Sequence, residues 1–174
     1  VVASGKGGGG KSTTSVNMAL ALSQLGARVG LLDADIYGPN VPQMLGSQDA
    51  QVKVENKKFH PVHVHGIQSI SLAHLVDVNA PIVWRGPMIS KMLEQLLHDT
   101  LWDDLDYLVI DLPPGTGDIQ LTLGKKIPVS GAIMVTTPED IALLDAKRGI
   151  EMFHKVKIPV LGMVENMAQH VCSQ

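Results

Sequence analysis

Short apolar runs alternate with amphipathic segments along most of the chain. Runs rich in aliphatic residues, which are typical of buried strands, lie at 1–4, 27–33, 67–72, 106–111, 131–136 and 160–165. Helical spacing predicts helices at 13–25, 88–101, 119–126 and 139–156. The helix at 88–101 has the clearest apolar face, formed by Ile89, Met92, Leu93, Leu96, Leu97 and Leu101. This alternation predicts an α/β fold, a doubly wound and mostly parallel sheet with helices on both faces.

One segment, 46–66, is polar and mixed, and we expect a loop or an irregular hairpin there. It contains three histidines, His60, His63 and His65, at a spacing that metal ligands can have. On a strand, His63 and His65 would share a face and His60 would point away. Structural zinc usually takes four ligands, and no cysteine lies nearby. A solvated histidine-rich loop is therefore favoured over a metal site.

A glycine-rich segment separates the first expected strand from the first expected helix. It fits the phosphate-loop pattern G-x-x-x-x-G-K-[ST] at Gly5, Gly10, Lys11 and Ser12. Glycines let backbone N–H groups approach phosphate oxygens, Lys11 supplies positive charge for the β- and γ-phosphates, and the Ser12 hydroxyl can bind Mg²⁺. A merely flexible turn would not need to end in Gly-Lys-Ser. We expect the nucleotide to contact Gly5, Lys6, Gly7, Gly8, Gly9, Gly10, Lys11, Ser12 and Thr13.

Acidic residues follow two of the expected strands, on the side where parallel sheets bind ligands. Asp33 and Asp35 come at the end of the run at 27–33, and Asp111 ends the run at 106–111. Asp111 has the position of a Walker B aspartate, whose carboxylate holds the water shell of Mg²⁺. The segment after it, LPPGTGD at 112–118, contains Gly115, whose N–H can meet a γ-phosphate. These residues predict a site for ATP and Mg²⁺.

Composition narrows the class of partner. A net charge of −3 and 3% aromatic residues argue against nucleic acid as a partner, by charge attraction or by base stacking. No apolar run reaches the roughly 20 residues that span a bilayer, and no signal peptide is recognised, so no membrane partner is expected. The single cysteine suits a reducing cytoplasm. The 174 residues predict one P-loop NTPase domain, which we expect to be trimmed at both ends.

The chain resembles a known family at several of these motifs. The additional lysine of the loop, Lys6, resembles the deviant P-loop of the MinD/ParA partition ATPases, the nitrogenase iron protein and the Mrp/ApbC-type iron–sulfur carriers. Stretches similar to bacterial Mrp/ApbC proteins are GLLDADIYGPNVPQMLG at 30–46, VWRGPM at 83–88, LDYLVIDLPPGTGDIQLTL at 105–123, VTTPEDIALLDAKRGIEMF at 135–153 and PVLGMVENM at 159–167. They leave mainly 47–66 unmatched. The chain departs from the family at Gly9, where a small aliphatic residue is usual, so the resemblance implies a looser loop.

The resemblance implies an ATPase mechanism with assigned residues. Lys6 would act in trans on the nucleotide of a partner in a homodimer, and Lys11 would act in cis. Asp35 would orient the attacking water, with Asp33 nearer the Mg²⁺. Asn166, after the last strand, would pair with adenine, although a plain turn asparagine is the alternative.

The resemblance also implies a cargo. Mrp/ApbC-type proteins hold a [4Fe-4S] cluster, bridged across the homodimer by a C-x-x-C pair from each subunit, and pass it to apo-proteins. Cys172 stands where the first of these cysteines belongs. A [4Fe-4S] cluster usually takes four thiolates, so Cys172 alone is an incomplete ligand set.

Two other functions are compatible with the same loop. A MinD/ParA-type positioning ATPase would need a membrane-binding amphipathic helix or a basic surface for DNA, and the sequence shows neither. A reductase like the nitrogenase iron protein would need cysteines earlier in the chain than Cys172. The sequence therefore favours an ATP-dependent iron–sulfur cluster carrier.

Overall fold

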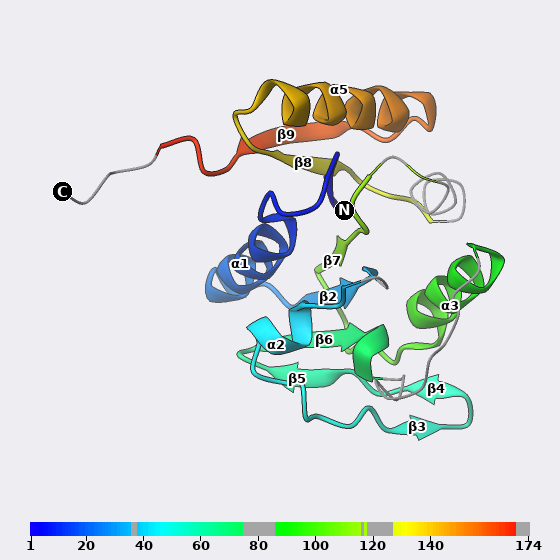
Figure 1. Ribbon diagram of the computed structural model, residues 1–174. Coiled ribbons are helices and arrows are strands. Elements are labelled where there is room, and N and C mark those ends of the chain that lie inside the picture. Colours follow the sequence, from blue (N-terminus) through cyan, green and yellow to red (C-terminus); the bar gives the residue numbers. More distant parts are fainter. Residues whose placement is uncertain (36–37, 75–85, 116, 118–126, 170–174) are drawn as a thin grey trace. The chain divides into compact units, whose positions relative to one another are not determined.

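The computed structural model of the protein describes all residues except 36–37, 75–85, 116, 118–126 and 170–174. The chain divides into two structural units, one formed by Val1–Lys11 with Pro114–Gln174 and the other by Ser12–Pro113. The boundary falls in the first turn of helix α1 (Lys11–Gln24), directly after the glycine-rich loop. Each unit has its own set of hydrogen-bonded strands (Figure 1).

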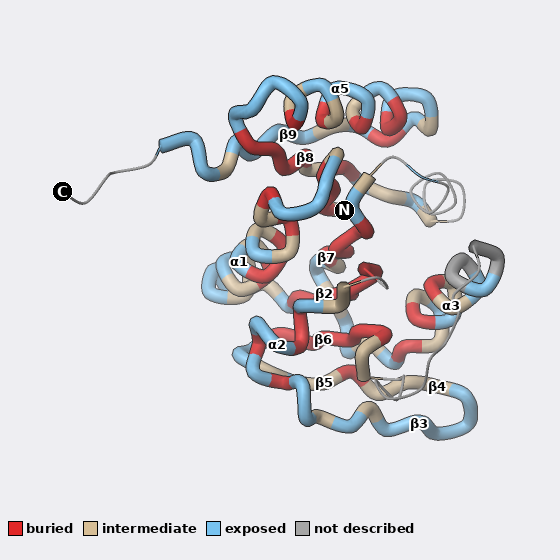
Figure 2. Tube along the Cα trace, viewed as in Figure 1, coloured by how far each residue is buried: buried red, intermediate tan, exposed pale blue. Residues whose placement is uncertain are grey.

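The strands of the unit Ser12–Pro113 occur in the order β5 (Val62–Val64), β6 (Ile67–Ser71), β2 (Val29–Asp33) and β7 (Tyr107–Asp111). Strand β2 is parallel to both β6 and β7, whereas β5 is antiparallel to β6. Every residue of β2 and β6 is buried (Figure 2). The prediction of a buried parallel strand at 27–33 is therefore confirmed, although the strand begins at Val29.

The polar segment at 46–66, expected to be a loop or an irregular hairpin, contains a short hairpin. Strands β3 (Val54–Glu55) and β4 (Lys58–Phe59) pair antiparallel, and the turn residues Asn56 and Lys57 both have positive φ. Two such residues form a tight turn whose twist matches that of the strands. Two shorter elements, helix α2 (Val41–Met44) and the 3₁₀ helix η1 (Leu72–His74), were not predicted because they are too short for a periodic signal.

Helix α3 (Gly86–Asp99) corresponds to the helix predicted at 88–101. Leu93 and Leu96 are buried, as the apolar spacing indicated. Leu101 was also expected on this face, but it lies beyond the end of the helix and is 44% exposed. The apolar period continued past the point where the chain leaves the helix, so this assignment was wrong.

The unit formed by residues 1–11 and 114–174 contains three parallel strands in the order β1 (Val2–Ser4), β8 (Ala132–Thr136) and β9 (Val160–Glu165). Helix α5 (Asp140–Lys155) runs alongside β8 and β9 in Figure 1. It buries Ala142, Ala146, Gly149, Met152 and Phe153. Strand β9 is exposed along most of its length, although its sequence is apolar.

The described part of the chain includes no helix that is both long enough and apolar enough to cross a membrane. The short helix predicted at 119–126 lies outside the described residues.

Candidate functional site

Three polar side chains end three neighbouring strands of the unit Ser12–Pro113. In the register of the parallel strands, Asp33 of β2 is the partner of Ser71 of β6 on one side and of Asp111 of β7 on the other. All three residues are at most 1% exposed. Strands that end together therefore gather two carboxylates and a hydroxyl at one edge, as the sequence predicted for Asp33 and Asp111.

The carboxylate of Asp111 is held by two serines of helix α1. Ser12 Oγ donates a hydrogen bond of 2.6 Å to Oδ2, and Ser15 Oγ donates one of 2.6 Å to Oδ1. Residues three positions apart lie on the same face of a helix, so both hydroxyls can point to one carboxylate. Sequence reasoning found Ser12 but missed Ser15; the signal was its spacing of three residues from Ser12.

The carboxylate of Asp33 is oriented by its neighbours on both sides. Ser71 Oγ donates to Oδ2 at 3.0 Å, and the backbone N–H of Asp35 donates to Oδ1 at 3.1 Å. Ala34, which lies between Asp33 and Asp35, donates its N–H to the carbonyl of Asp111 at 2.9 Å. Asp35 itself is 8% exposed. The backbone after β2 is therefore held in place at the strand ends, and it brings Asp35 close to Asp33.

Three glycines of the loop are required by geometry. Gly8 and Gly10 have φ of +85° and +87°, which side chains rarely adopt. A Cβ on Gly5 would lie 2.5 Å from the backbone carbonyl carbon of Asp145 in α5, so the loop could not approach that helix as closely. The loop pattern seen in the sequence is thus explained by backbone conformation and close packing.

Gly9 is different from these glycines. Its φ lies outside the left-handed region, and a Cβ there would lie 3.7 Å from Thr137 Cγ2, an ordinary van der Waals contact. The structure therefore leaves room for a Cβ at the position where the family resemblance led us to expect a small aliphatic residue.

The two lysines of the loop lie in different surroundings. Lys11 is 6% exposed, whereas Lys6 is exposed. Lys6 lies close enough to Glu139 for its positive charge to act on that carboxyl. The pKa of Glu139 is lowered mainly by a hydrogen bond from the Thr137 hydroxyl, and the charge of Lys6 contributes to the same shift.

Asn166 follows β9 and lies against the loop. Its backbone N–H donates to the carbonyl of Thr136 at 2.8 Å, and its side-chain Nδ2 donates to the carbonyl of Gly9 at 3.0 Å. Gly115, predicted to contact a γ-phosphate, donates its N–H to the carbonyl of Ser4 at 2.8 Å. Asn166 therefore contacts the loop, and Gly115 contacts β1, the strand that leads into the loop. Cys172 lies outside the described residues.

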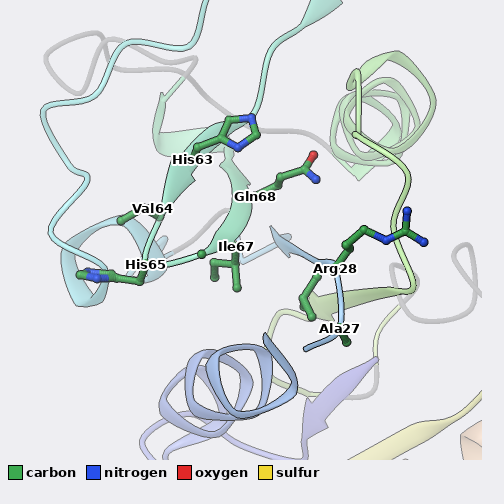
Figure 3. Close-up of a pocket in the computed structure, with 9 residues that line it drawn as sticks. Ala27, Arg28, His63, Val64, His65, Ile67 and Gln68 are labelled. Carbon is green, nitrogen blue, oxygen red and sulfur yellow. The ribbon is translucent and has the colours of Figure 1, made fainter. Parts of the chain in front are cut away.

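The three histidines do not come together. His60 Nε2 lies 3.5 Å from Glu55 and His63 Nε2 lies 3.5 Å from Asp103, whereas His65 Nε2 lies 3.1 Å from the carbonyl of Leu45. His65 lies beyond the end of β5 with a positive φ, so the two histidines are not on one strand and the shared face that a common strand would give them does not arise; the two rings point apart in Figure 3. Among the described residues, no group of three or more His, Cys, Asp or Glu side chains could hold a metal ion.

A pocket of about 320 Å³ is lined partly by His63 and His65 (Figure 3). It is lined partly by Val29 and Ile67, the first residues of β2 and β6. Asp33 and Ser71 lie at the opposite ends of the same strands. Arg28, on the pocket wall, is already paired with Asp104 and Asp106. This pocket is therefore separate from the candidate site.

The sequence as a whole matches a family model described as ParA, NUBPL iron-transfer P-loop NTPase, over residues 1–174. The chain belongs to this family. It is 62% identical to a protein of Pseudomonas fragi named iron-sulfur cluster carrier protein, over 99% of this chain and 61% of that protein. A protein of the same name from Escherichia coli K12 is 60% identical, over 99% of this chain and 47% of that protein. The chain thus spans about half to three fifths of the length of these curated relatives.

Solved structures confirm the predicted fold class. A nucleotide-binding protein from Archaeoglobus fulgidus, solved in complex with ADP, superposes with a TM-score of 0.83 at 37% identity, over 98% of this chain and 68% of that one. The MinD cell division protein of Aquifex aeolicus superposes with a TM-score of 0.66 at 26% identity, over 94% of this chain and 66% of that one. This chain therefore has the mostly parallel α/β architecture of P-loop NTPases, and the family resemblance seen in its motifs is confirmed.

Proposed function

We propose that this protein is an ATP-binding and ATP-hydrolysing carrier that assembles [4Fe-4S] clusters or transfers them to apo-proteins. The observation that carries the proposal is the identity of 60–62% with proteins named iron-sulfur cluster carrier, in a chain of the iron-transfer P-loop NTPase family. The geometry of the loop and of the buried acids supports the ATPase part. The cargo part rests on the relatives and on Cys172.

In the proposed ATP site, the loop from Gly5 to Thr13 binds the phosphates through backbone N–H groups, and Lys11 supplies charge. Ser12, Asp33 and Asp111 form a donor set of oxygen atoms only, which suits Mg²⁺. Such an ion keeps several waters and needs only one or two carboxylates from the protein. When bound, it would neutralise charge on the phosphates. Ser15 and Ser71 orient the two carboxylates through the hydrogen bonds already described.

Hydrolysis requires a positioned water and stabilisation of developing charge. In the proposal, Asp35 orients the water. The N–H of Gly115 donates to the Ser4 carbonyl in the structure, so it would meet the γ-phosphate only after that hydrogen bond breaks. Lys6 reaches the nucleotide of the partner in a homodimer, and its exposure is compatible with that role. Asn166, at the end of β9, lies against the loop, and contact with the adenine base is the role that the family resemblance implies for it.

The cluster is the cargo of the proposed carrier, and Cys172 would contribute to its binding in a homodimer. Each subunit must supply further thiolates for a complete set of four. A cytoplasmic location belongs to the same proposal, because a reducing compartment keeps such thiolates available.

The test uses the complete protein, reconstituted without oxygen with iron and sulfide. We expect bound iron and sulfide, charge-transfer absorption, and transfer of the cluster to an apo-acceptor. The Cys172→Ser variant should lose the cluster and keep ATP turnover. Absence of iron and sulfide from the reconstituted protein would contradict the carrier function while leaving the ATPase intact.

A MinD/ParA-type positioning ATPase is the alternative, and it has a structural basis in the likeness to MinD. Its 26% identity is much lower than the 62% identity to a named carrier. ATP-dependent binding to anionic vesicles, without cluster binding, would favour this alternative.

A further inference from the structure

The loop is anchored to a residue that lies 157 positions further along the chain. Asn166 Nδ2 donates a hydrogen bond of 3.0 Å to the carbonyl oxygen of Gly9. The asparagine is itself fixed, because its backbone N–H donates to Thr136 at the carboxyl end of the neighbouring strand β8. A Cβ on Gly10 would lie 2.2 Å from Asn166 Nδ2, so glycine at that position leaves room for the amide. We infer that Asn166 is a positioning residue that holds the phosphate loop in its binding conformation.

The peptide geometry explains what this hydrogen bond controls. The Gly9–Gly10 peptide is trans and planar, so the C=O of Gly9 and the N–H of Gly10 point in opposite directions. An amide that fixes the C=O therefore also fixes the direction of the N–H. That N–H belongs to the group of backbone donors that a phosphate loop presents to its anion.

The composition of the loop gives it considerable conformational freedom, which such an anchor would restrict. Glycine has the greatest conformational freedom of any residue, and it occupies five of the six positions from Gly5 to Gly10. Gly7 and Gly8 have no atoms within 4 Å of a Cβ position, and so have little packing to restrain them. A side chain whose backbone is hydrogen-bonded to the end of β8 supplies a restraint that these glycines do not supply themselves.

This inference rests on the proposed nucleotide site. The positioning role that it gives to Asn166 differs from recognition of the adenine base. A residue that only pairs with adenine would affect ligands that carry the base. A residue that positions the loop would affect any ligand that carries the phosphates. Magnesium tripolyphosphate separates the two roles, because it has the phosphate chain and no base.

The experiment compares ATP, GTP and magnesium tripolyphosphate as ligands of the complete protein and of three variants. Asn166→Ala removes the amide, and Asn166→Asp keeps its size but replaces the donor with a carboxylate that would face the Gly9 carbonyl. Glu165→Gln, at the exposed neighbouring position, is the control. In each Asn166 variant we expect ATP binding and tripolyphosphate binding to weaken by the same factor. That factor should be about tenfold for Asn166→Ala, which loses one hydrogen bond, and larger for Asn166→Asp. The ratio of ATP to GTP affinity should not change.

Hydrogen exchange without ligand gives a second measurement. The amides of Gly9 and Gly10 should exchange faster in Asn166→Ala than in the natural protein, while thermal unfolding of the variant remains cooperative. Unchanged tripolyphosphate binding, together with a loss of preference for ATP over GTP, would overturn the positioning role in favour of base recognition. If the natural protein bound neither ATP nor tripolyphosphate, the proposed ATPase function would fail instead.

Discussion

Asp33 and Asp111 lie side by side as register partners at the ends of β2 and β7, and both are almost completely buried. Burial of a carboxylate is unfavourable unless hydrogen bonds replace its water. Serine hydroxyls provide these bonds to both residues. Two adjacent carboxylates with ordered oxygen neighbours form a place where a small divalent cation is favoured.

The hydrogen bond from Ser15 to Asp111 leads to a first prediction. We expect Ser15→Ala to lower Mg²⁺-dependent ATP turnover about tenfold or more, because partners that orient metal-associated carboxylates typically have effects of this size. Ser23→Ala is the matched control, since Ser23 lies on the same helix but its hydroxyl donates to the exposed carbonyl of Gly66. Phosphate release as a function of Mg²⁺ concentration measures the effect. Equal activity of the two variants would contradict the role of Ser15.

Asp35 allows binding and hydrolysis to be separated. Asp35→Ala should keep ATP binding and lower turnover by about 10²–10⁴-fold, because a residue that orients the attacking water acts on the chemical step. Asp49→Ala, at an exposed position, should leave both unchanged. Equilibrium nucleotide titration and steady-state phosphate release are the measurements. Unchanged turnover in Asp35→Ala would exclude this role.

The action of Lys6 in trans can be tested by mixing two inactive variants. In a mixed dimer of Lys6→Ala and Asp35→Ala, one site combines Asp35 of the first subunit with Lys6 of the second. Random mixing in equal amounts should restore about a quarter of the natural activity, since half of the dimers are mixed and each has one complete site. If Lys6 acts in cis, no site is complete and mixing restores nothing.

Gly9 and Gly10 should respond in opposite ways to alanine. Gly9→Ala should stabilise the protein by about 0.4–1 kcal/mol, because its φ lies outside the left-handed region and the methyl group would contact Thr137 normally. Gly10→Ala should be destabilising, because of its positive φ and the clash with Asn166. Denaturant unfolding of both variants checks the prediction. A destabilised Gly9→Ala would show that the loop needs glycine there for another reason.

An acid-dependent contribution to stability is expected at Arg28. Hydrogen bonds from Arg28 lower the pKa of Asp106 from an ordinary 3.8 to about 2. A carboxyl with a depressed pKa in the folded state stabilises the fold above its unfolded pKa, and this contribution is lost as the pH falls towards the folded value. The stability difference between the natural protein and Arg28→Gln should therefore shrink as the pH falls from about 4 towards 2. Both partners are exposed, so the difference should be small and should decrease in high salt.

Local patterns in the sequence were sufficient for the longer elements and for the main motifs, although the short helices α2 and η1 were missed. Buried parallel strands are apolar runs, and the loop pattern is contiguous, so β2, β7 and the phosphate loop could be identified before any contact was known. The positions of Asp33 and Asp111 at strand ends followed from the same runs. Helix α5 was likewise evident from its spacing, to within one residue at each end.

Contacts between residues far apart in sequence were decided only by the tertiary structure. The strand register brings Ser71 to Asp33, and the placement of α1 brings Ser15 to Asp111. The pairing of Asn166 with Gly9 depends on where β9 ends relative to the loop. Periodicity says which face of an element is apolar, but it does not say which neighbour that face meets. For that physical reason the sequence determined the longer strands and helices and the phosphate loop of this protein. The tertiary structure decided which side chains orient the carboxylates of Asp33 and Asp111 and the loop.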